Sequence, residues 1–157
     1  MYRAVFSSGN SDDKYFRGNE LLFTVKTKQP FIGSKSRCSI FKNDKLIFSF
    51  SETVFTRLFW NLNILTQNLD KKVFIEKVKR KYVLVVDGRK IFLKFTNNPF
   101  TKRLSEIYLD GNLIGEINKK YDKSGTNFLF DFYENSELEY YVLILFTMYS
   151  VGIAGGD

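Results

Sequence analysis

The sequence predicts a mostly β protein: a closed antiparallel β-barrel around a buried C-terminal hydrophobic helix. Short apolar-rich stretches follow one another at nearly regular spacing with turn residues between them, which is typical of an all-β barrel or sandwich. Aromatic residues make up 17% of the chain, and such side chains suit a pleated, half-buried surface. The chain then ends in the apolar run YYVLILFTMYSVGIAGGD. Its 157 residues fit one domain over residues 1–157.

Three stretches are expected to form β-hairpins, because each places a turn dipeptide between two apolar-rich arms. They are SIFKNDKLIFSF (39–50), YVLVVDGRKIFLKF (82–95) and EIYLDGNLIGEI (106–117). Asp87-Gly88 and Asp110-Gly111 tolerate the positive φ angles that type I′ turns require, and Asn43-Asp44 is a weaker version of the same signal. These hairpins account for six strands.

Further strands are expected around the hairpins. The segments are LLFTVKTK (21–28), RLFWNLNIL (57–65), KVFIEKVK (72–79) and NFLFDFYE (127–134). The last of these alternates cleanly, with Phe128, Phe130 and Phe132 on one side. The segment 57–65 can also be read as a helix, so its strand assignment has an alternative.

A helix is predicted over about residues 136–154. Ser136 and Glu139 have the spacing of a capping box, in which each side chain accepts a hydrogen bond from a free backbone N–H group. Beyond Tyr140 the residues are apolar on every side of the helix. Such a helix is either a membrane span or fully buried.

The length and the flanks of this helix favour burial. A span needs about 20 apolar residues, whereas 140–154 gives roughly 22 Å of helix. The preceding residues Glu134, Glu137 and Glu139 differ from the Lys and Arg that flank spans on the cytoplasmic side. We therefore expect no transmembrane span, with an anchor or an interfacial tail as alternatives. A closed barrel is the simplest wall for a buried helix.

The composition excludes several classes of catalytic site. The chain has no histidine, which is the commonest general base and a common metal ligand, and its single Cys38 has no histidine to activate it. We therefore expect no enzyme activity, no metal and no cofactor, and an enzyme that uses other side chains is a third alternative. The N-terminus has no apolar run of signal-peptide length. Together with the absence of a disulfide framework, this indicates a cytoplasmic protein.

The order of these elements resembles the tubby C-terminal-like fold, the group of tubby proteins, plant LURP-one-related proteins and phospholipid scramblases. The resemblance rests on the three hairpins, on NFLFDFYE and on the terminal run, over roughly residues 36–157. It is a resemblance of layout. It implies a barrel of antiparallel strands around a C-terminal hydrophobic helix. In this group, tubby domains bind phosphoinositides through basic residues on the outer barrel wall.

The segment 76–95 is the most informative candidate site. A two-residue turn at Asp87-Gly88 places Lys81 opposite Lys94 on one outer face, and period-two alternation adds Lys79. With the residues at its margins, the predicted basic stripe consists of Lys79, Arg80, Lys81, Arg89, Lys90 and Lys94. Like charges placed opposite each other are destabilising, so the stripe favours an anionic partner. The alternative is a solvated strand face whose lysines discourage aggregation.

The formal net charge of +7 agrees with an acidic partner. We expect a non-catalytic binding domain that contacts anionic phospholipid headgroups, peripherally at a membrane surface, or an acidic protein. Nucleic acid is not the expected ligand. The alternative is a protein–protein interaction module of the adaptor or immunity type.

Overall fold

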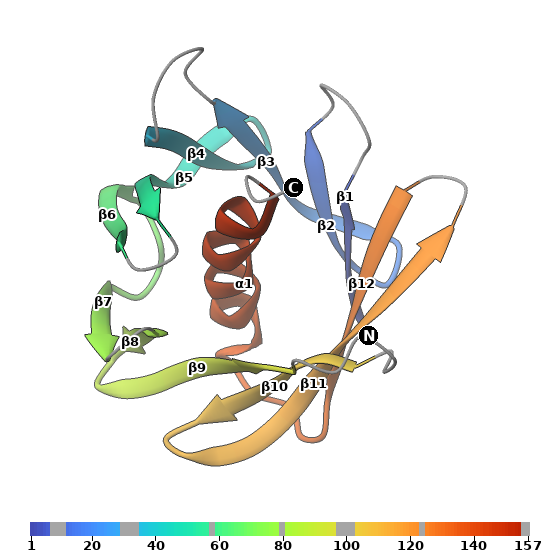
Figure 1. Cartoon of the computed structure of the whole chain (residues 1–157). Coiled ribbons are helices and arrows are strands. Elements are labelled where there is room, and N and C mark those ends of the chain that lie inside the picture. The colour runs from blue at the N-terminus through green and yellow to red at the C-terminus, as the bar shows by residue number, and fades with distance from the viewer. Residues whose placement is uncertain are drawn as a thin grey trace.

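The computed structural model describes residues 1–6, 12–28, 35–56, 59–78, 81–96, 103–122 and 125–154, without the side chains of 54–56, 59–60, 122 and 151–154. Twelve β-strands curl around one central helix (Figure 1). The strands are β1 (Tyr2–Phe6), β2 (Asp13–Arg17), β3 (Glu20–Lys28), β4 (Lys35–Lys42), β5 (Lys45–Thr56), β6 (Phe59–Gln67), β7 (Val73–Val78), β8 (Lys81–Val86), β9 (Arg89–Phe95), β10 (Arg103–Leu109), β11 (Asn112–Asp122) and β12 (Gly125–Phe132). The helix is α1 (Glu139–Ala154).

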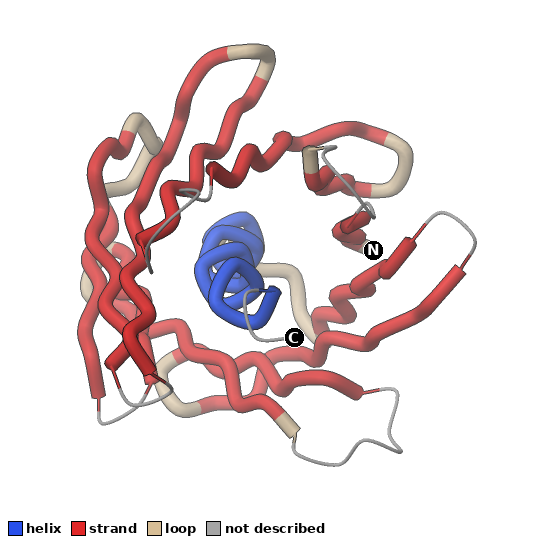
Figure 2. The backbone as a smooth tube through the Cα atoms, turned by 45° about the horizontal axis from the view of Figure 1, so that its top comes forward, coloured by secondary structure: helices blue, strands red, loops and turns tan. Residues whose placement is uncertain are grey.

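All described strand pairs are antiparallel, and the sheet order is β6-β5-β4-β3-β2-β1-β12-β11-β10-β9-β8-β7. Neighbours in the sheet are neighbours in the sequence, except that β1 pairs with β12 and so joins the two halves of the chain. Figure 2 shows the strands as a ring around the helix. The predicted fold class is therefore confirmed.

The three predicted hairpins form with the expected turns. Asn43, Asp44, Asp87 and Asp110 all adopt positive φ between 49° and 60°, as type I′ turns require. The segment 57–65 lies within strand β6 rather than in a helix, apart from residues 57–58, which are outside the described ranges. Strands β1 and β2 were not expected from the sequence.

Helix α1 runs through the barrel and forms its core. Residues 141–150 are all buried, and Phe146 lies with its ring centroid 5.0 Å from Phe128 and 5.1 Å from Phe130. Ser136 and Glu139 cap the helix as predicted: the Ser136 N–H donates to Glu139 Oε1 at 3.0 Å, and the Leu138 N–H donates to Ser136 Oγ at 3.1 Å. In the described part of the chain, no helix has the length and hydropathy for a membrane crossing.

The ends of the sheet, β6 and β7, meet along a seam without a described backbone ladder between them. Side chains bridge the seam instead. Val73 N–H donates to Gln67 Oε1 at 2.9 Å, and Lys77 Nζ donates to Asn61 Oδ1 at 3.4 Å. The Tyr82 hydroxyl oxygen also forms a hydrogen bond with the Leu62 backbone. Closure of the barrel thus depends on side-chain contacts at this one place.

Candidate functional site

The predicted basic stripe lies on the outer wall of β8 and β9. Lys81, Arg89, Lys90 and Lys94 are all exposed, while Tyr82, Leu84, Val86, Ile91 and Leu93 point inward and are buried, as the alternation predicts. Val83 departs from the pattern because it is buried on the outer side. Lys79 and Arg80 lie outside the described residues.

The predicted pairing of Lys81 with Lys94 is not among the described strand pairs. The β8–β9 ladder covers Val86↔Arg89, Val85↔Lys90 and Leu84↔Ile91. At the next hydrogen-bonded position, the Tyr82 N–H donates to the Tyr149 hydroxyl at 2.9 Å, and that hydroxyl donates to the Tyr82 carbonyl at 3.1 Å. Helix α1 thus supplies the partner that β9 would supply in a regular hairpin.

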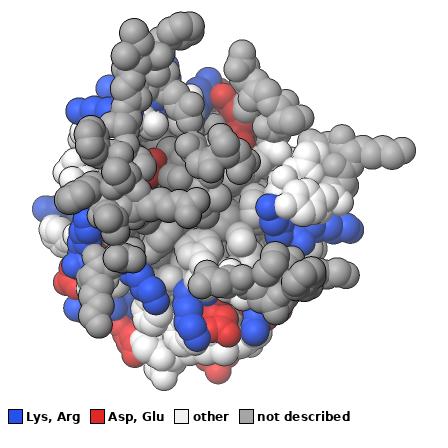
Figure 3. All heavy atoms as spheres, viewed as in Figure 1, with Lys and Arg blue, Asp and Glu red and all other residues white. Residues whose placement is uncertain are grey.

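Acidic residues from β7, β10 and the β10–β11 turn pair with three of the four described cations of this stripe. Arg89 Nε lies 2.8 Å from Asp110 Oδ2, Lys90 Nζ lies 2.8 Å from Glu76 Oε2, and Lys94 Nζ lies 3.2 Å from Glu106 Oε2. Basic and acidic side chains alternate along the lower rim of the molecule, over β9–β11 (Figure 3). Of the described stripe residues, only Lys81 has no ion pair with the described part of the chain.

The pKa shifts at these pairs follow from the same contacts. The Tyr108 hydroxyl and the Lys94 ammonium both donate to Glu106 and lower the pKa of its carboxyl group. The Lys90 backbone N–H and the Arg89 guanidinium do the same for the pKa of Asp110. These carboxylates are charged at neutral pH, so they stay available to the cations beside them.

A second group of cations, which the sequence reasoning missed, lies on the outer wall of β3 and β4. Lys28 is directly opposite Arg37, and both side chains are exposed, as is Lys35. None of these three has an ion pair with a described residue. We call Lys28, Lys35 and Arg37 the basic face. Period-two alternation through 24–28 and 35–41 could have found it.

Hydroxyl and amide side chains continue the basic face across β5 and β6. The row Lys28–Arg37 extends to Ser51 and Asn63, and the row that starts at Lys35 extends to Thr53 and Asn61. One row further along, Ser39 pairs with Ser49, whose buried hydroxyl has no hydrogen-bond partner among the described residues. Ser49 and Ser51 are buried, so the first two rows combine cations that have no ion pair with a described residue with the exposed amide groups of Asn61 and Asn63.

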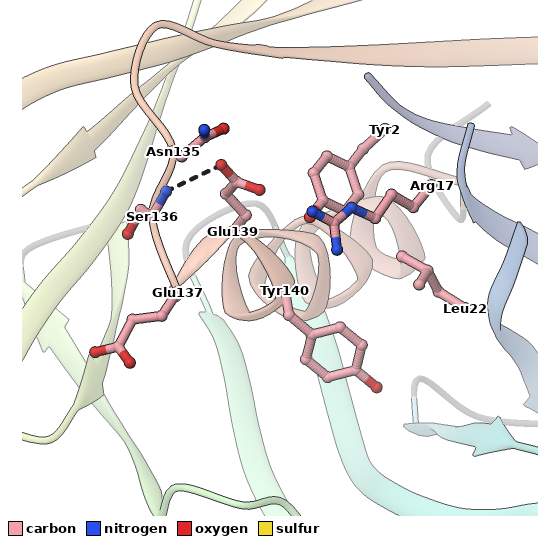
Figure 4. A pocket seen from close by; sticks show the side chains of 8 residues that line it. All are labelled: Tyr2, Arg17, Leu22, Asn135, Ser136, Glu137, Glu139 and Tyr140. Atoms are coloured by element: carbon pink, nitrogen blue, oxygen red, sulfur yellow. Dashed lines mark hydrogen bonds between the residues drawn. The ribbon is translucent and has the colours of Figure 1, made fainter.

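Two cavities lie at the end of the barrel where α1 begins. Tyr2, Arg17 and Leu22 line one side of the first, which has a volume of about 360 Å³, and the segment that leads into α1 lines the other (Figure 4). The second, of about 370 Å³, shares Glu137 and Tyr140 with it. Lys71 Nζ contacts Glu137 Oε1 at 2.8 Å and Asp87 Oδ2 at 3.2 Å, so these charges are already matched.

Neither cavity contains a recognisable catalytic arrangement. The structure shows no group of metal-ligating side chains within its described ranges. Cys38 is buried in the barrel wall, and burial raises the pKa of its thiol to about 12. A thiol in this state is a small apolar side chain rather than a nucleophile.

Comparison with protein-family models, with curated proteins and with solved structures finds no match for this chain.

Proposed function

We propose that this protein is a non-catalytic binding domain whose basic face contacts anionic phospholipid headgroups at a membrane surface. One observation carries the proposal: Lys28 stands directly opposite Arg37, and neither side chain has an acidic partner among the described residues. Two like charges in this position destabilise the sheet, and an anion between them relieves the repulsion. The stripe on β9 lacks this property because its cations are paired.

The neighbouring side chains fit a phosphorylated headgroup. Arg binds phosphate oxygens through two parallel N–H groups and Lys binds them as a point charge. Asn61 and Asn63 are exposed on β6, with β5 between them and the basic face, and provide amide groups for the polar part of the headgroup. Lys81 adds a further cation from across the seam.

The layout of twelve antiparallel strands around a C-terminal helix supports the resemblance to the tubby C-terminal-like group. A cytoplasmic location with peripheral membrane contact belongs to the same proposal. An acidic protein surface would meet the same cations, and an interaction module is therefore the alternative function.

Vesicle sedimentation tests the proposal. We expect the protein to sediment with vesicles that contain phosphatidylserine or phosphoinositides, to stay in solution with neutral phosphatidylcholine vesicles, and to be released as salt rises. No sedimentation with anionic vesicles at low salt would refute lipid binding. Salt-sensitive capture of an acidic protein without vesicle binding would favour the alternative.

A further inference from the structure

Three large apolar side chains are exposed on the two strands that flank the seam. Leu65 on β6 is 48% exposed, and Phe74 and Val78 on β7 are 55% and 51% exposed. Val73 and Ile75 on β7 face the core. Because side chains alternate between the two faces of a strand, Phe74 and Val78 lie on its outer side. We call these three residues the seam strip.

A row of side chains leads from the basic face across β5 and β6 to the seam. The row Lys35–Thr53–Asn61 reaches β6, and Lys77 joins Asn61 across the seam at 3.4 Å. The next residue on β7, Val78, is paired with Lys81 on β8. Lys81, which has no ion pair with a described residue, therefore lies beside Val78 on the outer face.

The other end of the strip also carries a cation. Lys72 Nζ lies 5.5 Å from the centroid of the Phe74 ring. Glu76, which lies between Phe74 and Val78 on the outer face, is paired with Lys90 at 2.8 Å. The strip thus consists of apolar side chains interrupted by this one ion pair, with Lys72 at one end and Lys81 at the other.

We infer that the seam strip enters the interfacial region of an anionic bilayer when the basic face binds headgroups. Phe74 and Val78 then add an apolar contribution to the membrane affinity that salt does not weaken. This inference rests on the proposed function. Apolar residues bordered by Lys or Arg bind membrane surfaces by burying apolar area while the cations contact anionic lipids. A second copy of the chain does not fit the strip, because the cations at its margins would repel their counterparts.

The test compares the wild type with a Phe74→Ser, Val78→Ser double variant on phosphatidylcholine vesicles that contain phosphatidylserine, at low and at moderate salt. Leu113→Ser is the matched control, because Leu113 is 43% exposed on β11, away from the seam. We expect the double variant to bind about tenfold more weakly, mainly at moderate salt. A roughly tenfold loss of affinity is what partial burial of one aromatic side chain contributes. The Leu113→Ser variant should bind as the wild type does.

A second measurement reports insertion directly. An environment-sensitive fluorophore on a cysteine at position 74, in a Cys38→Ser background, should shift to the blue on anionic vesicles, whereas the same label at position 113 should not. The inference would be overturned, and the proposed function left standing, if the wild type and the double variant bound anionic vesicles equally well and the label at position 74 showed no blue shift. Absence of any wild-type binding would overturn both. Self-association that depends on Phe74 would show that the strip is a protein contact and would also overturn the inference.

Discussion

The hydroxyl group of Tyr149 on helix α1 holds both backbone hydrogen-bonding groups of Tyr82 on strand β8, at 2.9 and 3.1 Å. The central helix is therefore joined to the wall by hydrogen bonds as well as by packing. The Tyr149 ring also lies 5.0 Å from that of Phe95 on β9, so it sits where β8 and β9 separate. This contact lies directly beyond Leu84↔Ile91, where the described β8–β9 ladder stops.

Tyr149→Phe should destabilise the protein by about 1–3 kcal/mol, because it leaves a buried N–H and a buried carbonyl of Tyr82 without their partner. Urea unfolding followed by circular dichroism measures the change. Tyr121→Phe is the control, since Tyr121 is 70% exposed and should unfold as the wild type does. Equal stability of Tyr149→Phe and wild type would show that β8 does not depend on the helix.

Phe146→Ala should cost about 3–5 kcal/mol of the free energy of unfolding, because it opens a cavity between α1 and the rings of Phe128 and Phe130. Phe92→Ala on the outer wall should cost less, since Phe92 is only half-buried and stacks on Tyr108. Thermal unfolding of the two variants compares them. A larger loss in Phe92→Ala would contradict a core centred on the helix.

Ser136→Ala should destabilise the protein by about 0.5–2 kcal/mol, because the Leu138 N–H loses its acceptor at the start of α1. Ser136→Asp should restore most of this loss, since Asp also caps helices and suits the positive end of the helix dipole. Denaturant midpoints of the three proteins measure both effects. Failure of Asp to recover stability would mean that Ser136 acts in some other way than as a cap.

Stability should fall in alkaline solution. Burial raises the Cys38 pKa from 9.0 to about 12, so the folded state holds this proton more tightly than the unfolded state does. The resulting stabilisation is complete below pH 9 and is lost as pH rises towards 12, with a slope of up to about 1.4 kcal/mol per pH unit. The pKa of buried Tyr15 is raised too and adds to the loss at higher pH.

The Cys38→Ala variant separates the contribution of the thiol to this pH dependence from that of the tyrosines. Its unfolding free energy should depend less steeply on pH than that of the wild type just above pH 9, whatever its absolute stability. Free thiol titration provides an independent check, because Cys38 should react with a thiol reagent only after unfolding. Rapid reaction in the native state would contradict its burial.

Local sequence signals were sufficient to predict the three hairpins and the C-terminal helix. The Asp87-Gly88 and Asp110-Gly111 dipeptides set their turns through backbone conformation, and the run after Tyr140 has no polar face to expose. Strands β1 and β2 were missed because their short segments, YRAVF and DKYFR, have no clear alternation. β1 is held by pairing with β12, more than a hundred residues away in sequence.

The candidate site depends on the same long-range pairing. A cluster of lysines and arginines in 76–95 is visible in the sequence, but the acids that neutralise it are not all nearby in the chain. Lys94 meets Glu106 because β9 pairs with β10 in one register across the segment 97–102. Lys28 and Arg37, by contrast, have no acidic partner among the described residues, because their described neighbours on β5 and β6 are hydroxyl and amide residues.

The central claim is that the basic face, whose cations have no acidic partner among the described residues, binds anionic lipid, and that the paired cations of β9 do not. The direct measurement compares Lys28→Gln, Arg37→Gln with Lys90→Gln, Lys94→Gln in vesicle sedimentation, since each double variant lowers the net charge equally, from +7 to +5. We predict roughly ten- to thirtyfold weaker binding for the first variant, at about 1 kcal/mol per basic residue, and a much smaller loss for the second. Equal losses, or a loss confined to the second variant, would contradict the account.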